Sequence, residues 1–350
     1  MIVIDAIIFS LQKHGGISTY FKNLIQILDS ENTKSSVFIY ETDVKVASKR
    51  FIFQSKRILE RIRPIKIGYN EESTTLLHSS YYRFSKSKHV KNVITVYDFI
   101  YEKFEKNIIK KYIHIIQKSI AVKHSSAIIC ISESTKNDFL EFYPNYDANK
   151  IFVTHLAHST KSVEFENDFN FDNKFLKPYC LFVGMRSFHK NFDSCVLALK
   201  DLEIEFKIIG GGNLNKIELA LLDSTIPGRY QHLTNVDNEA LNKYYENAIC
   251  LLYPSIYEGF GLPILEAMAN GCAVITTNAS SIPEVAGDAA ILLEDPSPSF
   301  IEDSIIALLN PSINKSLINK GFRNCEKFSW EITIKKTIEI YNQILDNDFC

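Results

Sequence analysis

Short apolar runs alternate with amphipathic helical patterns along the first half of this chain. Strands separated by helices predict a parallel, doubly wound sheet, because a parallel connection needs a long crossover that is usually a helix. Apolar residues at every second position predict a strand, and apolar residues at every third or fourth position predict a helix. The predicted strands are 2–9, 36–40, 76–78, 93–96, 127–131 and 151–154, and the predicted helices are 17–28, 109–123 and one from Glu133 after an N-cap at Ser132.

A polar stretch, 159–178, interrupts this alternation and predicts an interdomain linker, and 350 residues suffice for two domains. The second half predicts α/β structure again. Its predicted strands are 179–183, 206–209, 248–253, 273–276 and 289–293, and its predicted helices are 192–199, 263–269, 300–309 and 330–345. The fold class is therefore α/β, with two Rossmann-like doubly wound domains. Such sheets bind ligands at the carboxyl ends of their strands, so we expect the domains to face one another across a ligand-binding cleft.

The strongest functional signal is the string EGFGLPILE at 258–266, which follows an apolar run and opens a predicted helix. Gly259 and Gly261 allow close backbone approach to a ligand, and the N–H groups of a helix start attract a diphosphate. Glu266 lies on the first turns of that helix, where a carboxylate can accept bonds from ribose hydroxyls. A plain strand–turn–helix with solvated glutamates is the alternative, and we favour the ligand site.

With the strings AMANG at 267–271 and PEV at 283–285, this segment closely resembles the family-four retaining glycosyltransferases of the GT-B fold. The resemblance covers most of the chain and is densest from Leu181 to Pro296. It implies a Rossmann-like acceptor domain at 1–160, a nucleotide-sugar donor domain at 176–328, and a helix at 329–346 that crosses back to the first domain.

The resemblance also implies roles for the residues of the string. Glu258 would contact the transferred sugar near its anomeric carbon, as an orienting and electrostatic group rather than a nucleophile. The backbone amides of Phe260, Gly261 and Leu262 would bind sugar hydroxyls and phosphate, and Glu266 would hold the ribose.

A second loop, VGMRSFHKN at 183–191, carries Arg186 and Lys190 after a predicted strand. Fixed cations stabilise the charge that grows on a nucleoside diphosphate as it leaves, and the family uses an Arg and a Lys here for that purpose. Met185 stands where relatives usually carry Gly. Two exposed basic residues would be the better interpretation of the loop alone, but beside the glutamate string we favour the diphosphate contact.

Three glycine or backbone segments resemble further nucleotide contacts. Gly15-Gly16 follows the first strand, and Gly16 is the candidate contact in the family's N-terminal glycine loop. The triple glycine 210–212, with Gly211 as the candidate, resembles the turn under the nucleotide, although a tight structural turn is an equal alternative. Asn235 and Val236 match the position where the family's backbone reads the base.

Two strand ends of the predicted acceptor domain carry polar side chains. Asp98 could orient or deprotonate the acceptor hydroxyl, and a helix cap or turn is an equal alternative. Tyr97 replaces the His that many relatives carry before this Asp. The string SSYYR at 79–83 suits a sugar or phosphate, but a surface loop explains it at least as well.

The resemblance to GT-B enzymes implies no metal requirement and no cofactor besides the nucleotide-sugar substrate, because cationic side chains take the place of a metal ion in that fold. His155 and His158 have no carboxylate or Cys partner nearby in the sequence, and DND at 346–348 follows a helix rather than a strand. The seven cysteines form no C-x-x-C pair and predict reduced, mostly buried thiols.

Eight basic residues and one acid, Glu60, lie between Lys45 and Lys66. A helix over 45–66 would be amphipathic and would suit an anionic membrane surface, whereas a basic helix packed on the domain is an equal alternative. Nucleic-acid binding is disfavoured, because the net charge is -2 and no recognition motif accompanies the segment. We expect a cytoplasmic protein with peripheral contact at the inner face of the cell membrane.

The predicted activity is retaining transfer of a hexose from GDP-mannose or a UDP-sugar to a glycan or lipid-linked glycan hydroxyl. The overall resemblance to bacterial surface-polysaccharide enzymes, especially O-antigen mannosyltransferases, implies lipopolysaccharide, O-antigen or capsule synthesis. An epimerase-like GT-B enzyme and a catalytically silent sugar-nucleotide sensor are the alternatives. A dehydrogenase is disfavoured, since no G-x-G-x-x-G follows the first strand.

Overall fold

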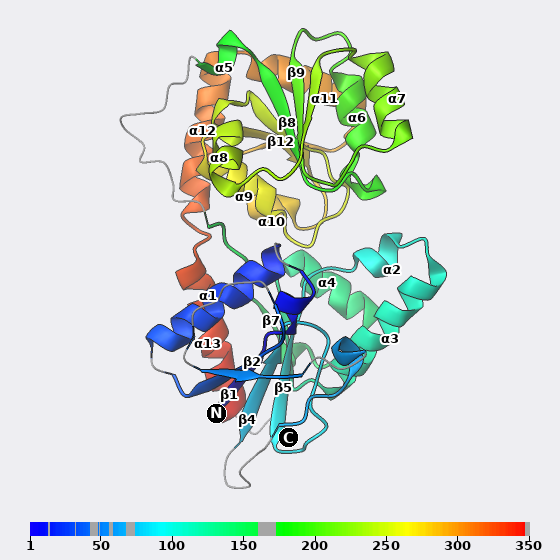
Figure 1. Ribbon diagram of the computed structural model, residues 1–350. Helices are drawn as coiled ribbons and strands as arrows, with labels where there is room; N and C mark the ends of the chain where they lie inside the picture. Colours follow the sequence, from blue (N-terminus) through cyan, green and yellow to red (C-terminus); the bar gives the residue numbers. More distant parts are fainter. Residues whose placement is uncertain are drawn as a thin grey trace. The chain divides into compact units, whose positions relative to one another are not determined.

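The computed structural model describes residues 1–12, 15–31, 33–42, 48, 50–55, 59–67, 74–159 and 173–346. The chain divides into two compact units, one of Met1–Leu156 with Trp330–Cys350 and one of Ala157–Ser329. Each unit has a parallel sheet with helices on both faces, which confirms the predicted α/β class with two Rossmann-like doubly wound domains (Figure 1). Most of the predicted linker, 160–172, lies outside the described residues.

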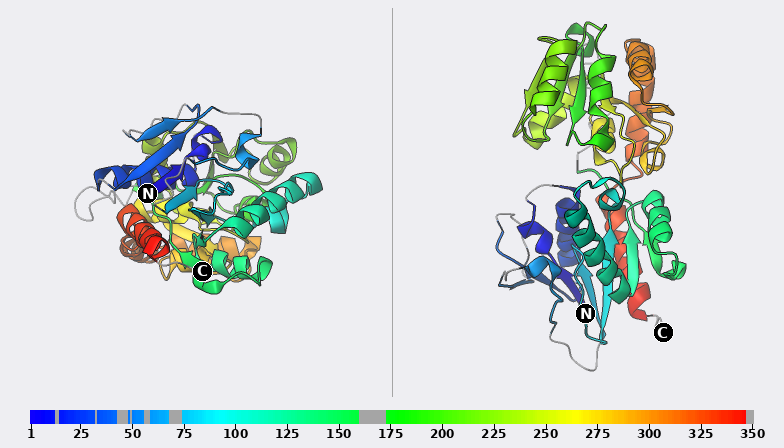
Figure 2. Two further views of the ribbon diagram at one scale, coloured as in Figure 1. Left: turned by 90° about the horizontal axis from the view of Figure 1, so that it is seen from below. Right: turned by 90° about the vertical axis from the view of Figure 1, so that its right-hand side faces the viewer.

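The sheet of the first unit has the order β3-β2-β1-β4-β5-β6-β7, and each neighbouring pair is parallel. Helices α1 and α13 cover one face and α3 and α4 cover the other (Figures 1 and 2). The strands are β1 Ile2–Asp5, β2 Ser35–Ile39, β3 Phe51–Phe53, β4 Thr75–Ser79, β5 Val90–Val96, β6 Ala127–Cys130 and β7 Ile151–Val153. The α-helices are α1 Gly16–Ser30, α2 Ile100–Phe104, α3 Ile108–His124, α4 Glu133–Phe142 and α13 Trp330–Asp346, and the 3-10 turns are η1 Ile7–Ser10, η2 Glu60–Ile62 and η3 Ala148–Lys150.

The sheet of the second unit has the order β10-β9-β8-β11-β12-β13 and is also parallel. Helices α6, α7 and α11 cover one face, and α8, α9 and α12 cover the other (Figure 1). The strands are β8 Tyr179–Val183, β9 Glu205–Ile209, β10 Tyr230–Leu233, β11 Cys250–Tyr253, β12 Ala273–Thr277 and β13 Ile291–Leu293. The helices are α5 Asn173–Leu176, η4 Phe188–Lys190, α6 Phe192–Ala198, α7 Lys216–Thr225, α8 Asn238–Asn247, α9 Leu262–Ala269, α10 Ile282–Ala286, α11 Pro298–Leu308 and α12 Pro311–Cys325.

The expectation of one helix over 45–66 is wrong in the part of that segment that the structure describes. Phe51–Phe53 is the edge strand β3, paired with Val37, Phe38 and Ile39 of β2. Aromatic and β-branched side chains favour this extended pairing over a helix. Residues 60–62 form only the turn η2, and 45–47, 49 and 56–58 lie outside the described residues.

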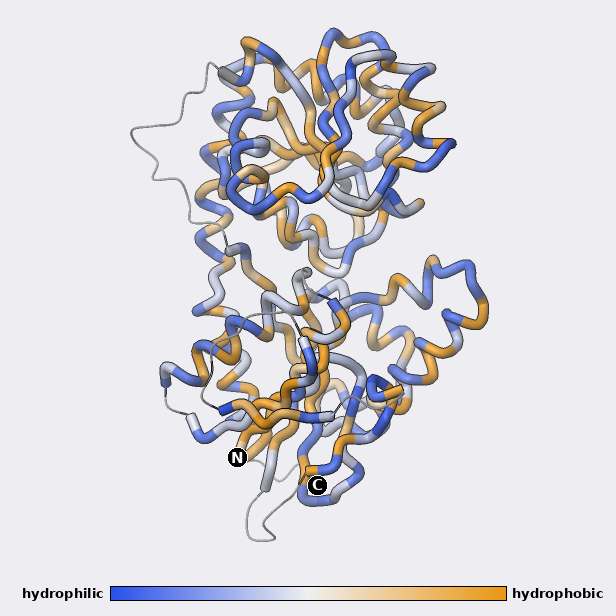
Figure 3. Tube along the Cα trace, viewed as in Figure 1, coloured by the Kyte–Doolittle hydropathy of each residue, from blue (hydrophilic) through white to orange (hydrophobic). Residues whose placement is uncertain are grey.

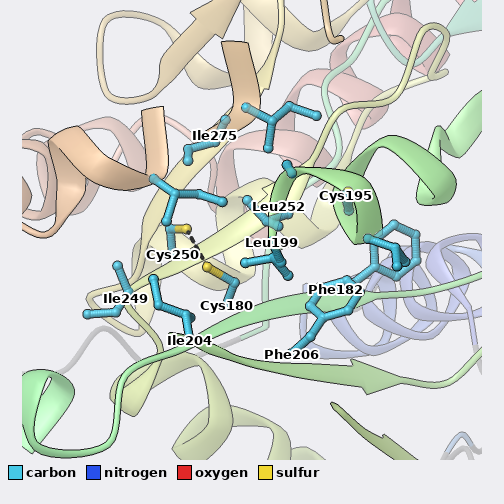
Figure 4. Packing of buried hydrophobic residues seen from close by; sticks show 14 of the residues in the cluster. Cys180, Phe182, Cys195, Leu199, Ile204, Phe206, Ile249, Cys250, Leu252 and Ile275 are labelled. Atoms are coloured by element: carbon cyan, nitrogen blue, oxygen red, sulfur yellow. Dashed lines mark hydrogen bonds between the residues drawn. The ribbon is translucent and has the colours of Figure 1, made fainter. Parts of the chain in front are cut away.

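The core of the second unit forms between its sheet and the helices α6 and α11. Phe182, Phe192 and Phe206 pack edge to face or stacked, and the strands β8 and β11 bring the thiols of Cys180 and Cys250 to 3.6 Å (Figure 4). The six cysteines among the described residues are buried free thiols. This packed layer fixes the strand ends from which the loops of the next section leave.

Helix α13 is attached to the first unit by buried polar contacts. The imidazole of His78 on β4 contacts the hydroxyl of Tyr341 through Nδ1 and that of Thr95 at 2.8 Å through Nε2. Tyr20 of α1 donates to Thr337 Oγ1 at 3.0 Å, and Thr337 donates to the Thr333 carbonyl. Burial lowers the pKa of His78 to about 3, so the ring is neutral and can accept from one hydroxyl and donate to the other.

We expect the first unit to lose stability as the pH falls from about 6.5 toward 3, because the unfolded chain can protonate His78 and the folded chain cannot. In His78→Gln, the slope of the unfolding free energy against pH should be shallower by up to about 1.4 kcal/mol per pH unit in this window. Urea unfolding followed by the fluorescence of Trp330, the single tryptophan, measures both slopes. Identical slopes would contradict the neutral, buried state of His78. The partly buried His114, whose pKa is also lowered to about 3, is present in both proteins, so its contribution cancels in the difference between the two slopes.

Candidate active site

The candidate site residues of the second unit come from loops at the carboxyl ends of its parallel strands. The loop after β8 carries Arg186 and Lys190, and the loop after β11 carries Glu258. The triple glycine 210–212 follows β9, and the strand β12 is followed by Ser280 and Ser281. Because β9, β8, β11 and β12 are neighbours in the sheet, these loops leave the same edge.

Lys190 and Glu258 form an ion pair, in which the Nζ of Lys190 donates to Oε1 of Glu258. Lys190 also donates to the hydroxyl of Tyr253 at 3.0 Å, and its Nζ lies 4.9 Å from the centre of that ring. Only 16% and 8% of the two charged side chains is exposed. Burial and the neighbouring carboxylates Glu258 and Glu266 raise the pKa of Tyr253 well above its usual value, so its hydroxyl stays protonated.

The turn that carries Glu258 is held by two serines that follow β12. The backbone N–H of Glu258 donates to Ser280 Oγ at 2.8 Å. The hydroxyl of Ser281 lies 3.0 Å from the carbonyl oxygen of Glu258 and 3.1 Å from that of Phe260. The sequence did not reveal Tyr253, Ser280 and Ser281, although a Ser pair in the loop after an apolar strand could have indicated the two serines.

The start of α9 follows this turn directly. Gly261 is the N-cap residue, and its φ of +104° is in the region that favours glycine. Leu262 and Pro263 open the helix, which places Glu266 on its second turn. Tyr245 of α8 donates to Oε2 of Glu266 at 3.2 Å, and burial raises the pKa of that carboxyl group. The helix start and Glu266 therefore lie where the sequence predicts them, beside the Glu258 turn.

Arg186 is held on the triple-glycine turn rather than on the Glu258 turn. Its Nη1 donates to the carbonyl of Gly210 at 2.8 Å, and its Nη2 lies 3.0–3.2 Å from the carbonyls of Gly211, Gly212 and Asn213. Its Nε lies 3.1 Å from the carboxylate of Glu218. A Cβ on Gly211 would lie 2.4 Å from Nη1 of Arg186, so the glycine is required for this packing. Sequence reasoning missed Glu218, which also forms the capping box of α7 with Asn215.

Asn235 and Val236 lie in the turn between β10 and α8, beside the triple glycine. The N–H of Gly210 donates to the carbonyl of Leu233 at 3.0 Å, which ties the two turns together. Asn235 has a left-handed φ of +56° and is exposed, and Asp237 caps α8. The structure thus brings the predicted base-reading segment next to the Arg186 turn.

The candidates of the first unit have mostly structural contacts. Gly16 is the first residue of α1 and Gly15 its N-cap, at which a Cβ would lie 2.6 Å from Nε2 of Gln12. One carboxylate oxygen of Asp98 accepts from the N–H of Ile100 at 3.0 Å, which is a turn role. An acceptor role for Asp98 stays a prediction.

The interpretation of 79–83 as an exposed loop is wrong at Arg83, which is 2% exposed. Its guanidinium donates to Asp5 at 2.9 Å, to Glu60 at 2.6 Å and to the Tyr40 hydroxyl at 2.6 Å. Ser79 donates to the other oxygen of Asp5 at 2.8 Å. Because the acids come from distant segments, the strand-end sequence alone could not reveal that Arg83 is a buried structural cation.

Within the described ranges, no three His, Cys, Asp or Glu side chains gather as a metal ion would require. None of the helices in that part of the chain combines the length and hydropathy needed to cross a bilayer. The predicted D-x-D look-alike at 346–348 lies mostly outside the described residues.

Residues 164–323 match the family described as glycosyl transferases group 1. An uncharacterized glycosyltransferase of Methanocaldococcus jannaschii is 26% identical over 95% of both chains. The O-antigen chain mannosyltransferase B of Escherichia coli is 29% identical over 66% of this chain and 65% of that protein. Among solved structures, sucrose-phosphate synthase from Thermosynechococcus elongatus has a TM-score of 0.75 at 16% identity and covers 98% of both chains, a likeness of fold alone.

The two parallel-sheet units and the structural likeness together give the GT-B fold. The family match lies over the unit that holds Arg186, Lys190 and Glu258, and the two relatives named above are glycosyltransferases. Residues 164–323 are therefore similar to the glycosyl transferases group 1 family, and the chain is a glycosyltransferase of the GT-B fold.

Proposed function

We propose that this enzyme transfers a hexose from a nucleotide-diphosphate sugar to a hydroxyl of a glycan or lipid-linked glycan, with retention of the anomeric configuration. The enzyme would act in the assembly of a bacterial surface polysaccharide, such as O-antigen, lipopolysaccharide or capsule. The observation that carries the proposal is the buried Lys190–Glu258 pair beside the helix start of α9. The O-antigen mannosyltransferase among the relatives favours GDP-mannose, and a UDP-sugar is the second choice of donor.

In the proposed step the acceptor oxygen attacks the anomeric carbon from the face that the diphosphate leaves. The bond from the anomeric carbon to the phosphate oxygen breaks, its electron pair stays on the diphosphate, and a diphosphate oxygen takes the acceptor proton. The ammonium of Lys190 has three N–H groups, two of which point to Glu258 and Tyr253, so the third is available to a phosphate oxygen. Glu258 orients the sugar and offsets the positive charge that develops at its anomeric carbon.

Arg186 supports the leaving group from the triple-glycine turn. One hydrogen of Nη1 and those of Nη2 are directed at carbonyl oxygens, which leaves the second Nη1 hydrogen for a phosphate oxygen. The N–H groups of Phe260, Gly261 and Leu262 would bind sugar and phosphate oxygens, Glu266 the ribose, and Asn235 and Val236 the base. With two cations in place, we propose that transfer needs no metal ion.

A lipid-linked acceptor would bring the enzyme to the inner face of the cell membrane. The described residues of the segment 45–66 would contribute to this membrane contact. Leu59 and Ile62 are 63% and 43% exposed, and Arg61 and Arg63 flank Ile62. Apolar side chains between cations suit a surface of anionic lipid.

A donor screen tests the proposed function. At a hundred times its dissociation constant, the true donor should stabilise the protein by about 2.7 kcal/mol, so thermal unfolding with GDP-mannose, UDP-sugars and ADP-sugars identifies it. With that donor and a lipid extract as acceptor, we expect a product with the donor's anomeric configuration by NMR and an unchanged rate in EDTA. An inverted product would refute retention, and a rate abolished by EDTA would refute metal independence.

Replacing both members of the ion pair, as Lys190→Met with Glu258→Gln, should lower kcat at least about 100-fold while the donor KM changes less than about tenfold. The double variant avoids an unpaired buried charge, which would cost about 3–5 kcal/mol of stability. The matched control is Lys200→Met, at an exposed lysine of the same unit. A large rise in KM with kcat unchanged would show that the pair only binds the donor.

Gly211→Ala should destabilise the second unit more than Gly212→Ala. Both glycines have a left-handed φ, +74° and +73°, so either alanine carries similar backbone strain of about 1 kcal/mol. A Cβ at 211 would also lie 2.5 Å from the Gly184 carbonyl, whereas one at 212 meets nothing within 4 Å. We expect an additional loss of about 1–3 kcal/mol and a smaller donor-induced thermal shift for Gly211→Ala only. Equal behaviour of the two variants would argue against the Arg186 contact with this turn.

A further inference from the structure

Helix α3 of the first unit exposes an unusual amount of apolar side chain. The hydropathy colouring of the trace shows hydrophobic residues along this part of the first unit (Figure 3). Most of the exposed apolar residues recur every three or four positions, which places them on one side of the helix. The opposite side carries Gln117, Lys118, Ala121 and Val122, which are buried. The exposed residues are Ile108 at 68%, Ile109 at 74%, Tyr112 at 60%, Ile113 at 49%, Ile116 at 56% and Ile120 at 44%.

The turn η2 enlarges this surface. Gln117 of α3 donates to the carbonyl of Arg61 at 2.7 Å, so the turn lies against the helix. Leu59 and Ile62, before and within the turn, add two further exposed apolar side chains. We call the six exposed residues of α3, together with Leu59 and Ile62, the α3 face.

Positive charge surrounds the α3 face. The helix has no Asp or Glu in its sequence, and Lys106, Lys110 and Lys123 are exposed along it. Arg61 and Arg63 are exposed on the adjoining turn. Two acids near the helix are paired, Glu102 with the buried Lys118 at 2.7 Å and Glu105 with Lys110 at 3.1 Å. The surface therefore combines apolar side chains with a net positive rim.

A cavity of about 300 Å³ adjoins the face. Its lining includes Arg61 and Lys110 together with Tyr81, Tyr101 and His114, and the rings of Tyr101 and His114 stack at 4.0 Å. Cations and tyrosine hydroxyls around a cavity of this size suit the phosphate group of a lipid. The apolar face and a polar recess for a headgroup thus lie next to one another.

We propose that the α3 face docks on an anionic lipid bilayer, with α3 lying in the plane of the membrane. The apolar side chains enter the boundary between headgroups and acyl chains, and the lysines and arginines contact lipid phosphates. The positive rim favours an anionic bilayer over a second copy of the chain, because a symmetric contact between two copies would bring two positive rims together. The biological role of this docking rests on the proposed function, in which the acceptor is lipid-linked. The docking itself can be measured without sugar transfer.

Co-sedimentation with vesicles tests the docking. Full-length protein should bind vesicles of phosphatidylglycerol with phosphatidylethanolamine, and bind vesicles of phosphatidylcholine much more weakly. Ile108→Gln with Ile116→Gln should lower the partition coefficient on anionic vesicles at least about tenfold, since two exposed apolar side chains are lost without loss of helix propensity. The matched control is Ile217→Gln with Ile306→Gln, at residues of the second unit that are 80% and 48% exposed, and it should bind like the parent protein.

A charge variant tests the rim separately. Lys106→Gln with Lys123→Gln should weaken binding to anionic vesicles about tenfold or more, and added salt should weaken the parent protein in the same way. The control is Lys200→Gln with Lys216→Gln, at lysines of the second unit. Unchanged binding of both the apolar and the charge variant would overturn the proposal.

Two further outcomes separate this inference from its rivals. If the purified protein is a dimer that Ile108→Gln with Ile116→Gln turns into monomers while vesicle binding persists, the α3 face joins two copies and the proposal is wrong. Donor-induced thermal stabilisation, measured on the same variant, should equal that of the parent protein. Vesicle binding by a protein that turns over no sugar nucleotide would refute the proposed function and leave docking intact.

Discussion

Lys190 and Glu258 form a buried ion pair that joins the loop after β8 to the loop after β11. Loss of one partner would leave a largely buried charge unpaired, at a cost of up to about 3–5 kcal/mol, so arrangements that separate the two loops are disfavoured. The serines after β12 hold the Glu258 turn from its other side. Because β8, β11 and β12 are adjacent in the sheet, the strand order determines which loops lie next to one another. The ion pair between Lys190 and Glu258 then fixes the contact between the loops after β8 and β11.

The two cations of the loop after β8 have different roles, although the sequence presents them as equivalent. Arg186 offers a planar fork of donors, and the structure uses most of it on the carbonyls of successive left-handed glycines and on Glu218. Lys190 is a point charge with a donor still available. Arg186 thereby orders the triple-glycine turn, and in the proposed reaction Lys190 is the cation better placed to stabilise the charge that moves onto a leaving diphosphate.

The sequence predicts the parts of this fold that depend on local pattern. The α/β alternation, the start of the helix after Gly261, and Glu258 with Glu266 follow from residues close together in the chain. The partners of those residues do not. Ser280 and Tyr245 lie more than twenty positions away from the groups they bind, and the Asp5–Arg83–Glu60 contacts join three separate segments. The short edge strand β3 was not predicted, because the apolar residues of this basic segment also fit the spacing of an amphipathic helix.

Helix α3 shows why an amphipathic pattern does not by itself tell which side of a helix faces the protein. The sequence predicts this helix with an apolar stripe, and such a stripe usually packs inward. Here Lys118 occupies the inward side, where Glu102 neutralises it and its ammonium also donates to the carbonyl of Asp98. A buried ion pair thus satisfies the polar side of the helix within the protein, and the isoleucines are left on the surface. The same inversion leaves the exposed apolar side chains mainly on α3 rather than on the basic segment, whose contribution to the α3 face is the turn around Arg61.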